Sequence, residues 1–258
     1  MTMKIMSFNL RYDNEGDGIN AFSSRLHRVI DTIRSEDADI IGFQETTVAM
    51  REVLRSRLND YVLVGCGRDR NYDGEGTIIA YKAELFELIS LENIWLSDTP
   101  SVPGSHFMDD HSNCPRMLTC AVLKHHEYGE PFRMINTHLD HVGTNARLSE
   151  ARFICDFVLR GEGDFVLVGD FNATPDAPEI KYIVDTLSTI GGADISSEVA
   201  GTFHNFGKFS EESKIKIDYI FSSLKSTRAY RVEDTPIDNQ YYSDHHAVCA
   251  EVDLGGNK

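Results

Sequence analysis

The sequence predicts an α+β protein in which β-sheets pack against each other and helices lie outside them. Three observations support this class: strand-like segments outnumber amphipathic helical ones, many follow one another as hairpins would, and several are apolar on both faces. The pattern lacks the regular alternation of strand and helix that builds a doubly wound parallel sheet. A strand that is apolar on both faces needs cover on both sides, and a second sheet with outer helices supplies it.

The first half of the chain combines two amphipathic helices with several apolar strands. Apolar residues recur at helical spacing in two segments, which predicts helices over residues 21–36 and 50–58. Short apolar runs bounded by turn-forming residues predict the strands. These runs cover residues 3–9, 38–45, 61–66, 76–82 and 86–96.

The second half begins with a loop rich in Pro, Gly and Asp at residues 97–115, and loops of this length are usually functional or mobile. A helix is predicted over residues 146–159. Another opens near Pro178, because proline is tolerated in the first helical turn. The remaining strands are predicted over residues 117–125, 132–139, 165–172, 214–223 and 245–254.

The length and composition favour one domain spanning residues 1–258, since 41% hydrophobic residues suffice for a full core and no linker or repeat divides the chain. No stretch has the apolar core of a signal peptide or approaches membrane-spanning length, so we expect no membrane insertion. The five cysteines are scattered and never form a C-x-x-C pair, which favours reduced thiols and a cytoplasmic location. The sequence does not indicate an oligomeric state.

The net charge of −16 bears on the substrate. Proteins that hold long duplex DNA through its phosphates usually present a basic face. Here 41 acidic residues outnumber 25 basic ones, so long duplex DNA is an unfavourable partner. A small or locally bound anionic substrate fits better, although charge alone does not exclude a local basic cleft.

The segment VLVGDFNATP, residues 166–175, starts as a buried strand and then turns polar. In extended backbone alternate side chains share a face, so Asp170 and Asn172 point the same way and Phe171 points to the other. A carboxylate and an amide are thereby delivered together at the end of a rigid strand.

The same pattern recurs at other predicted strands. Each of them carries a polar residue that is able to ligate a metal, move a proton or hold a phosphate. Gathered at one edge of a sandwich, these side chains would form a pocket whose hard oxygen ligands suit Mg²⁺ or Mn²⁺ better than zinc. They are Asn9, Glu45, His138, Asp170, Asn172, Asp218, Asp244 and His245.

In their order along the chain, the segments SFN, FQE, NTH, GDFN, IDY and SDH resemble the endonuclease/exonuclease/phosphatase superfamily. The resemblance runs from residue 3 to about residue 253, and six motifs in the right order are far more specific than any one of them. It implies a four-layer α/β/β/α sandwich of two packed mixed β-sheets flanked by helices, and divalent-metal-dependent hydrolysis of phosphate esters. The segments around NTHLDHVGTNAR look more like the uncharacterised bacterial members and the deadenylases than the abasic-site nucleases.

The resemblance also implies roles for the metal-binding residues. Glu45 is the first expected ligand of Mg²⁺ or Mn²⁺, and Asn9 and Asp244 complete the coordination directly or through water. Asp170 is expected to orient or deprotonate the attacking water.

The remaining roles concern the phosphate. Asn172 donates through its amide to a phosphate oxygen, and His138 and Arg116 contact the anion by analogy with the family. His245 pairs with Asp218, and acts either as an imidazolium that stabilises the transition state or as a general base.

Each residue also has a structural interpretation. Asn9 or Asp170 taken singly would be turn formers, His138 a structural histidine, and Arg116 a partner in an ordinary ion pair. Asp218 is different, because a carboxylate in a strand directed at the core needs a partner.

Three functions are therefore compatible with the sequence: a phosphomonoesterase or phosphodiesterase acting on a small or lipid-derived phosphate ester, a nuclease such as a 3′-directed RNA exonuclease, and a catalytically silent binding module. The catalytically silent binding module is disfavoured, because every motif position is still occupied by a residue that can ligate a metal, move a proton or hold a phosphate.

Overall fold

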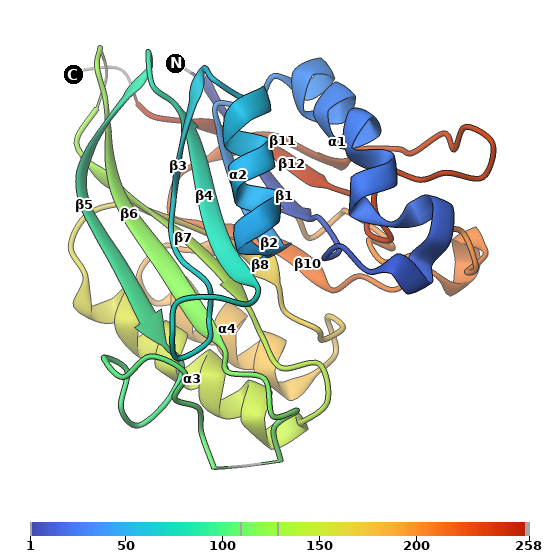
Figure 1. Cartoon of the computed structure of the whole chain (residues 1–258). Helices are drawn as coiled ribbons and strands as arrows, with labels where there is room; N and C mark the ends of the chain where they lie inside the picture. Colours follow the sequence, from blue (N-terminus) through green and yellow to red (C-terminus); the bar gives the residue numbers. More distant parts are fainter. Residues whose placement is uncertain (1, 109, 128, 256–258) are drawn as a thin grey trace.

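The computed structural model describes residues 2–108, 110–127 and 129–255 of the chain. Within these residues, two six-stranded mixed sheets pack face to face, and helices cover the outer face of each sheet (Figure 1). This arrangement confirms the predicted α+β sandwich with its layers of helix, sheet, sheet and helix.

The first sheet has the strand order β11-β12-β1-β2-β4-β3. The pair β1–β2 is parallel, and the other pairs in this sheet are antiparallel. Its strands are β1 (Thr2–Asn9), β2 (Ile40–Thr46), β3 (Tyr61–Val64), β4 (Gly76–Lys82), β11 (Ser226–Arg231) and β12 (Val248–Asp253).

The second sheet has the strand order β5-β6-β7-β8-β10-β9, and only the pair β7–β8 is parallel among the strands that the structure describes. Its strands are β5 (Phe86–Trp95), β6 (Met117–His125), β7 (Phe132–His138), β8 (Phe165–Asp170), β9 (Ala193–Asp194) and β10 (Asp218–Ser222).

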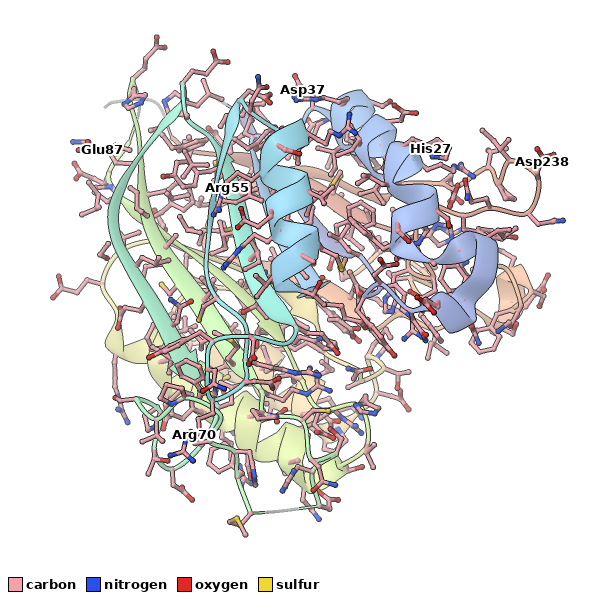
Figure 2. All side chains as sticks on the ribbon, in the orientation of Figure 1. His27, Asp37, Arg55, Arg70, Glu87 and Asp238 are labelled. Atoms are coloured by element: carbon pink, nitrogen blue, oxygen red, sulfur yellow. The ribbon has the colours of Figure 1, made fainter. Side chains whose placement is uncertain are left out.

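The helices divide between the two outer faces. The first sheet is covered by α1 (Phe22–Glu36) and α2 (Val48–Arg57), and the second by α3 (Thr144–Arg160) and α4 (Pro178–Ser188). Short 3₁₀ turns lie at Glu15–Asn20 and Glu211–Ser213. Charged side chains such as those of Arg55 and Glu87 point outward from this shell (Figure 2).

Apolar side chains fill the spaces between the layers. One cluster joins the first sheet to α1 and α2, and a second joins the second sheet to α3 and α4. A third cluster lies between the sheets and includes Ile5, Val168 and Val248. Strands such as β8 are therefore buried on both faces, which is the property that the sequence pattern indicated.

Two strands begin later than predicted. β10 begins at Asp218 instead of residue 214, because Ile215 forms only an isolated bridge to Phe203 and the backbone N–H of Ile217 donates to the Thr202 hydroxyl. β12 begins at Val248 instead of residue 245. The predictions also missed β11, whose residues are half-buried or exposed, and the two-residue strand β9.

Strand register brings the predicted polar residues to one edge of the sandwich. The parallel pair β1–β2 carries Asn9 and Glu45 at its carboxyl end, and the parallel pair β7–β8 ends with His138 opposite Asp170. The antiparallel strand β10 starts at Asp218, directly opposite Asp170. Residues from both sheets thus face one another across a single opening.

No helix among the described residues is long and apolar enough to cross a membrane.

Candidate active site

A pocket of about 560 Å³ opens at this edge, between the two sheets. Asn9 and Asp218 lie behind its wall, with exposed fractions of 0% and 1%. The other predicted site residues line the pocket; they are Glu45, Arg116, His138, Asp170, Asn172, Asp244 and His245.

Glu45 lies in a β-bulge of β2, where the register with β4 shifts between Phe43 and Thr46. Its backbone has a positive φ of 58°, a conformation that costs free energy for a residue with a side chain. Bulges re-aim side chains, and this one turns the carboxylate into the pocket. The carboxylate accepts hydrogen bonds from Asn9 Nδ2 at 3.1 Å and from the Tyr12 backbone N–H at 3.0 Å.

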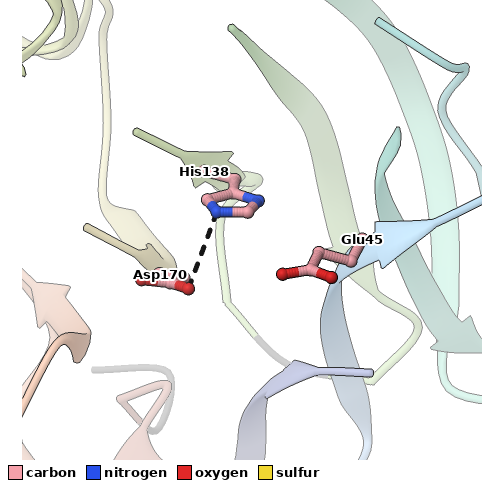
Figure 3. Close-up of side chains that lie close together, drawn as sticks. All are labelled: Glu45, His138 and Asp170. Carbon is pink, nitrogen blue, oxygen red and sulfur yellow. Dashed lines mark ion pairs between the residues drawn. The ribbon is translucent and has the colours of Figure 1, made fainter. Parts of the chain in front are cut away.

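Asp170 connects the two sheets. Its Oδ2 accepts a hydrogen bond of 2.9 Å from Asn9 Nδ2 on β1, and its Oδ1 accepts one of 2.9 Å from the Asn172 backbone N–H. Burial and the nearby charge of Asp218 raise the pKa of Asp170 to about 7. Figure 3 shows Asp170, His138 and Glu45 facing one another, with His138 Nε2 3.6 Å from Asp170 Oδ2.

Asn172 follows β8 in a left-handed conformation with a φ of 49°, while Phe171 packs into the core below it. Asn172 and Asp170 therefore share the pocket side, as predicted. The Asn172 amide nitrogen donates to the Leu139 carbonyl at 2.9 Å and lies 3.0 Å from His138 Nε2. Burial, with the positive charge of Arg116, lowers the pKa of His138, so its Nε2 is an acceptor for this amide.

His245 and Asp218 form the predicted pair. The His245 Nδ1 lies 2.9 Å from Asp218 Oδ2, and its Nε2 lies 3.7 Å from Asp170 Oδ2. Burial opposes the charged form, but Asp218 and then Asp170 outweigh it and raise the pKa of His245 to about 10. The imidazolium is thus held between two carboxylates.

Asp244 precedes His245 and is 6% exposed. Its Oδ2 lies 3.9 Å from the Nε of Arg11, which also pairs with Asp17 at 3.0 Å. Burial and the charge of Glu45 raise the pKa of Asp244. Its carboxylate is therefore close enough to Glu45 for the two charges to repel each other.

Arg116 lies just before β6 and is 3% exposed. Its Nη2 lies 2.9 Å from His141 Nδ1, and its Nε lies 3.9 Å from Asp140 Oδ2. Among the residues that the structure describes, the Nε and Nη1 groups have no hydrogen-bond partner. Buried donors in native proteins are nearly always paired, so these two are available to an acceptor on a bound ligand.

The donor set fits a divalent cation. One carboxylate oxygen each of Glu45 and Asp170 and a ring nitrogen of His138 all lie within 4.8 Å of one another. The raised pKa values of Asp170 and Asp244 show that the chain does not fully compensate the carboxylates it gathers here. Asn9 presents its amide nitrogen to Glu45 and Asp170, so direct ligation by its oxygen would require the amide to turn over.

Sequence reasoning missed several residues that build the pocket. Arg11 and Tyr12 follow β1 and secure Asp244 and Glu45, and Arg68 enters from the loop between β3 and β4. Thr202 lies in a segment without helix or strand. None of these positions belongs to a periodic pattern. Only Arg11 could have been indicated by the sequence, because it is a polar residue that closely follows a predicted strand, as Asp170 and Asn172 do in GDFN.

Thr202 fixes the start of β10. Its hydroxyl oxygen accepts hydrogen bonds from the backbone N–H groups of Ile217 at 3.0 Å and Asp218 at 3.1 Å. Its carbonyl accepts the N–H of His246 at 2.6 Å. One buried residue therefore links the segment that carries Asp218 to the segment that carries His245.

The family model described as "Endonuclease/Exonuclease/phosphatase family" matches residues 6–245. No curated protein matches the chain.

Three solved bacterial structures are similar over nearly the whole chain. An endonuclease/exonuclease/phosphatase from Bacteroides vulgatus is 30% identical, with 99% of this chain and 100% of that one covered and a TM-score of 0.91. A functionally unknown conserved protein from Enterococcus faecalis V583 is 27% identical, with coverages of 99% and 100% and a TM-score of 0.88. A mannosyl-6-phosphatase from Bacteroides thetaiotaomicron VPI-5482 is 26% identical, with coverages of 96% and 98% and a TM-score of 0.84.

We predict that Thr202→Val lowers the free energy of unfolding by about 1–3 kcal/mol, because it leaves buried backbone N–H groups without an acceptor. Thr202→Ser keeps the hydroxyl and should lose less than half as much. Urea denaturation of the three proteins measures the difference. A loss in Thr202→Ser as large as or larger than that in Thr202→Val would contradict the prediction, because it would show that the methyl group matters at least as much as the hydroxyl.

Proposed function

The chain belongs to the endonuclease/exonuclease/phosphatase family, and on this premise we propose that it is a phosphoric ester hydrolase that uses Mg²⁺ or Mn²⁺ to cleave a phosphomonoester or phosphodiester of a small or lipid-derived molecule. The observation that carries the proposal is the buried His245–Asp218 pair, whose imidazole faces the carboxylate of Asp170. Hydrolysis of a phosphate ester needs an activated water and charge stabilisation at the phosphoryl oxygens, and these three groups supply both.

Glu45, with Asn9 and Asp244 beside it, would hold the metal ion. A bound Mg²⁺ or Mn²⁺ supplies Lewis-acid stabilisation of the phosphoryl oxygens and lowers the pKa of a bound water. The surroundings support this assignment, because the carboxylates of Glu45 and Asp244 line the same pocket, and burial together with the charge of Glu45 raises the pKa of Asp244.

Asp170 orients the attacking water and accepts its proton. The carboxylate is fixed by hydrogen bonds from Asn9 and Asn172, so it needs little reorganisation during the reaction. His245 carries a positive charge between Asp218 and Asp170, which favours the imidazolium role over that of a general base. Its Nε2–H stabilises the negative charge that develops on the phosphoryl group.

Asn172, His138 and Arg116 bind the phosphate. The Asn172 amide is bonded to Leu139 and His138 when no substrate is present, so one of these bonds would be exchanged for a phosphate oxygen. Arg116 already has two buried donors without partners in the described part of the chain. Arginine suits this role because its fork of donors matches the geometry of phosphate.

The substrate class rests on two observations. The net charge of −16 disfavours long nucleic acids, and the pocket holds about 560 Å³, a size typical of small-molecule sites. The similarity to a mannosyl-6-phosphatase supports a small phosphate ester. A nuclease of the deadenylase type is the alternative, because it would use the same catalytic residues.

We also propose a cytoplasmic location and a single-domain organisation. All five cysteines have free thiols, which is consistent with the reducing cytoplasm. The family match over residues 6–245 supports a single domain over residues 1–258.

Glu45→Gln should raise the concentration of Mg²⁺ or Mn²⁺ required for half-maximal activity by roughly tenfold or more, because it removes a charged ligand. The thermal unfolding curve should change little, since the carboxylate faces the pocket. Activity is titrated with metal after EDTA treatment. Full turnover by the EDTA-treated wild type without added metal would refute metal dependence.

A substrate panel tests the class. With Mn²⁺, we expect hydrolysis of p-nitrophenyl phosphate or bis-p-nitrophenyl phosphate, weak activity on oligo(A), and poor nicking of supercoiled plasmid at physiological salt. The reason is the acidic surface, which repels long polyanions. Rapid shortening of oligo(A) would favour the nuclease. Rapid nicking would contradict the proposed substrate class and would indicate a local basic groove that binds DNA in spite of the net charge.

His245→Ala should lower the catalytic rate by roughly two to four orders of magnitude, the scale of acid–base groups. Asp218→Asn alone should cause a large part of the same loss in catalytic rate. Added to His245→Ala, it should lower the rate little further, because the two residues act as one unit. Single and double variants are compared at saturating substrate. A double variant whose loss equals the sum of the singles in free energy would show that the two residues act independently.

A further inference from the structure

A small cavity of about 10 Å³ shares five lining residues with the pocket and forms a narrow extension of it. That is room for one water-sized group. Its walls are Arg68 and Glu75 from the loop between β3 and β4, the start of β4, Arg116 just before β6, Met117 of β6, and the site residues Glu45 and His138.

The unmet hydrogen bonds in this extension belong to donors. Glu75 Oε1 is paired with Arg68 Nη2 at 3.0 Å, and both oxygens of Glu45 accept hydrogen bonds from the chain. In contrast, the buried Nε and Nη1 of Arg116 have no hydrogen-bond partner in residues 2–108, 110–127 and 129–255. The group that completes the extension is therefore an acceptor of the size of one oxygen atom.

Arg68 is held rigidly beside this space. Its backbone N–H donates to the Glu75 carbonyl at 3.0 Å, and its own carbonyl accepts the indole N–H of Trp95 at 2.5 Å. The side chain is 12% exposed. Arg68 and Arg116 line the same small cavity. Burial, and next the charge of Arg68, lowers the pKa of Arg116. Arg116 supplies two buried donors that lack a partner among the described residues, and Arg68 adds a second guanidinium group to the same cavity, a combination that favours an anion.

We propose that Arg68 and Arg116 together bind one non-bridging oxygen of a terminal phosphate, and that this subsite makes the enzyme prefer phosphomonoesters over phosphodiesters. The inference rests on the proposed hydrolase function and adds Arg68 as a specificity-determining residue.

The size of the extension provides the selection. A phosphomonoester has three non-bridging oxygens, and one of them fits a space of about 10 Å³. When one non-bridging oxygen is held at the metal and a second at Asn172 and His138, a monoester still has a third for this space. In a diester the remaining oxygens carry ester substituents, which do not fit there. The monoester also carries a second negative charge, which two guanidinium groups stabilise more than the single charge of a diester.

The experiment compares wild type, Arg68→Met, Arg68→Lys and the control Arg70→Met, which removes an exposed arginine from the same loop. Figure 2 shows Arg70 at the surface. The dissociation constant of inorganic phosphate is measured by calorimetry with Mg²⁺ present, and kcat/KM is measured on p-nitrophenyl phosphate and bis-p-nitrophenyl phosphate. Thermal unfolding checks that each variant is folded.

Arg68→Met should weaken phosphate binding by roughly tenfold to a hundredfold, the scale of a lost charged hydrogen bond. It should lower kcat/KM on the monoester by a similar factor while changing the diester value less than about threefold. For Arg68→Lys, the phosphate affinity and the kcat/KM on the monoester should lie between those of the wild type and Arg68→Met, because lysine keeps the positive charge but lacks the paired donors of a guanidinium group. Arg70→Met should match the wild type.

Equal losses on both esters, unchanged phosphate binding in folded Arg68→Met, or the absence of phosphate binding to the wild type would overturn the subsite. Failure of the proposed function gives a different result: phosphate binds and depends on Arg68, but the wild type hydrolyses neither ester.

Discussion

The carboxylate of Asp170 is the point on which the site depends, because it joins the two sheets. It belongs to β8 of the second sheet and accepts a hydrogen bond from Asn9 at the end of β1 in the first sheet. It also faces His138 and His245. A buried carboxylate is costly unless it is paired, so the surrounding donors are needed for the fold as well as for the chemistry. This shared requirement explains why the candidate site residues converge at one edge of the sandwich.

The fold supplies rigidity to both sides of this contact. Strands buried on two faces leave little freedom, and the unusual backbones of Glu45 and Asn172 are held by the sheets that flank them. The loops are fixed in another way. The buried guanidinium of Arg25 on α1 donates to four carbonyl oxygens, including those of Leu10 and Tyr242, and so ties the loop after β1 to the segment before Asp244. The pocket is therefore preorganised, as electrostatic catalysis requires.

The sequence was sufficient where local pattern and burial agree. The apolar runs predicted β1, β2 and β8, and the polar residue after each run predicted a member of the site, because a strand end determines where its next side chain lies. The sequence was insufficient where contacts between distant segments determine the position and the bounds of an element. The half-exposed β11 has no apolar period, and Ile215 and Ile217 alternate like a strand although Thr202 diverts the backbone. Arg68 and Thr202 lie in irregular segments, so nothing in their neighbourhood indicates which element they approach.

The central claim is that this edge of the sandwich is a metal-dependent hydrolytic centre organised around Glu45 and Asp170. The most direct test is anomalous diffraction from crystals soaked in Mn²⁺. The account predicts a strong peak within bonding distance of the Glu45 carboxylate, inside the pocket between the sheets. A peak bound only at other sites, or no peak near Glu45 at saturating Mn²⁺, would contradict it.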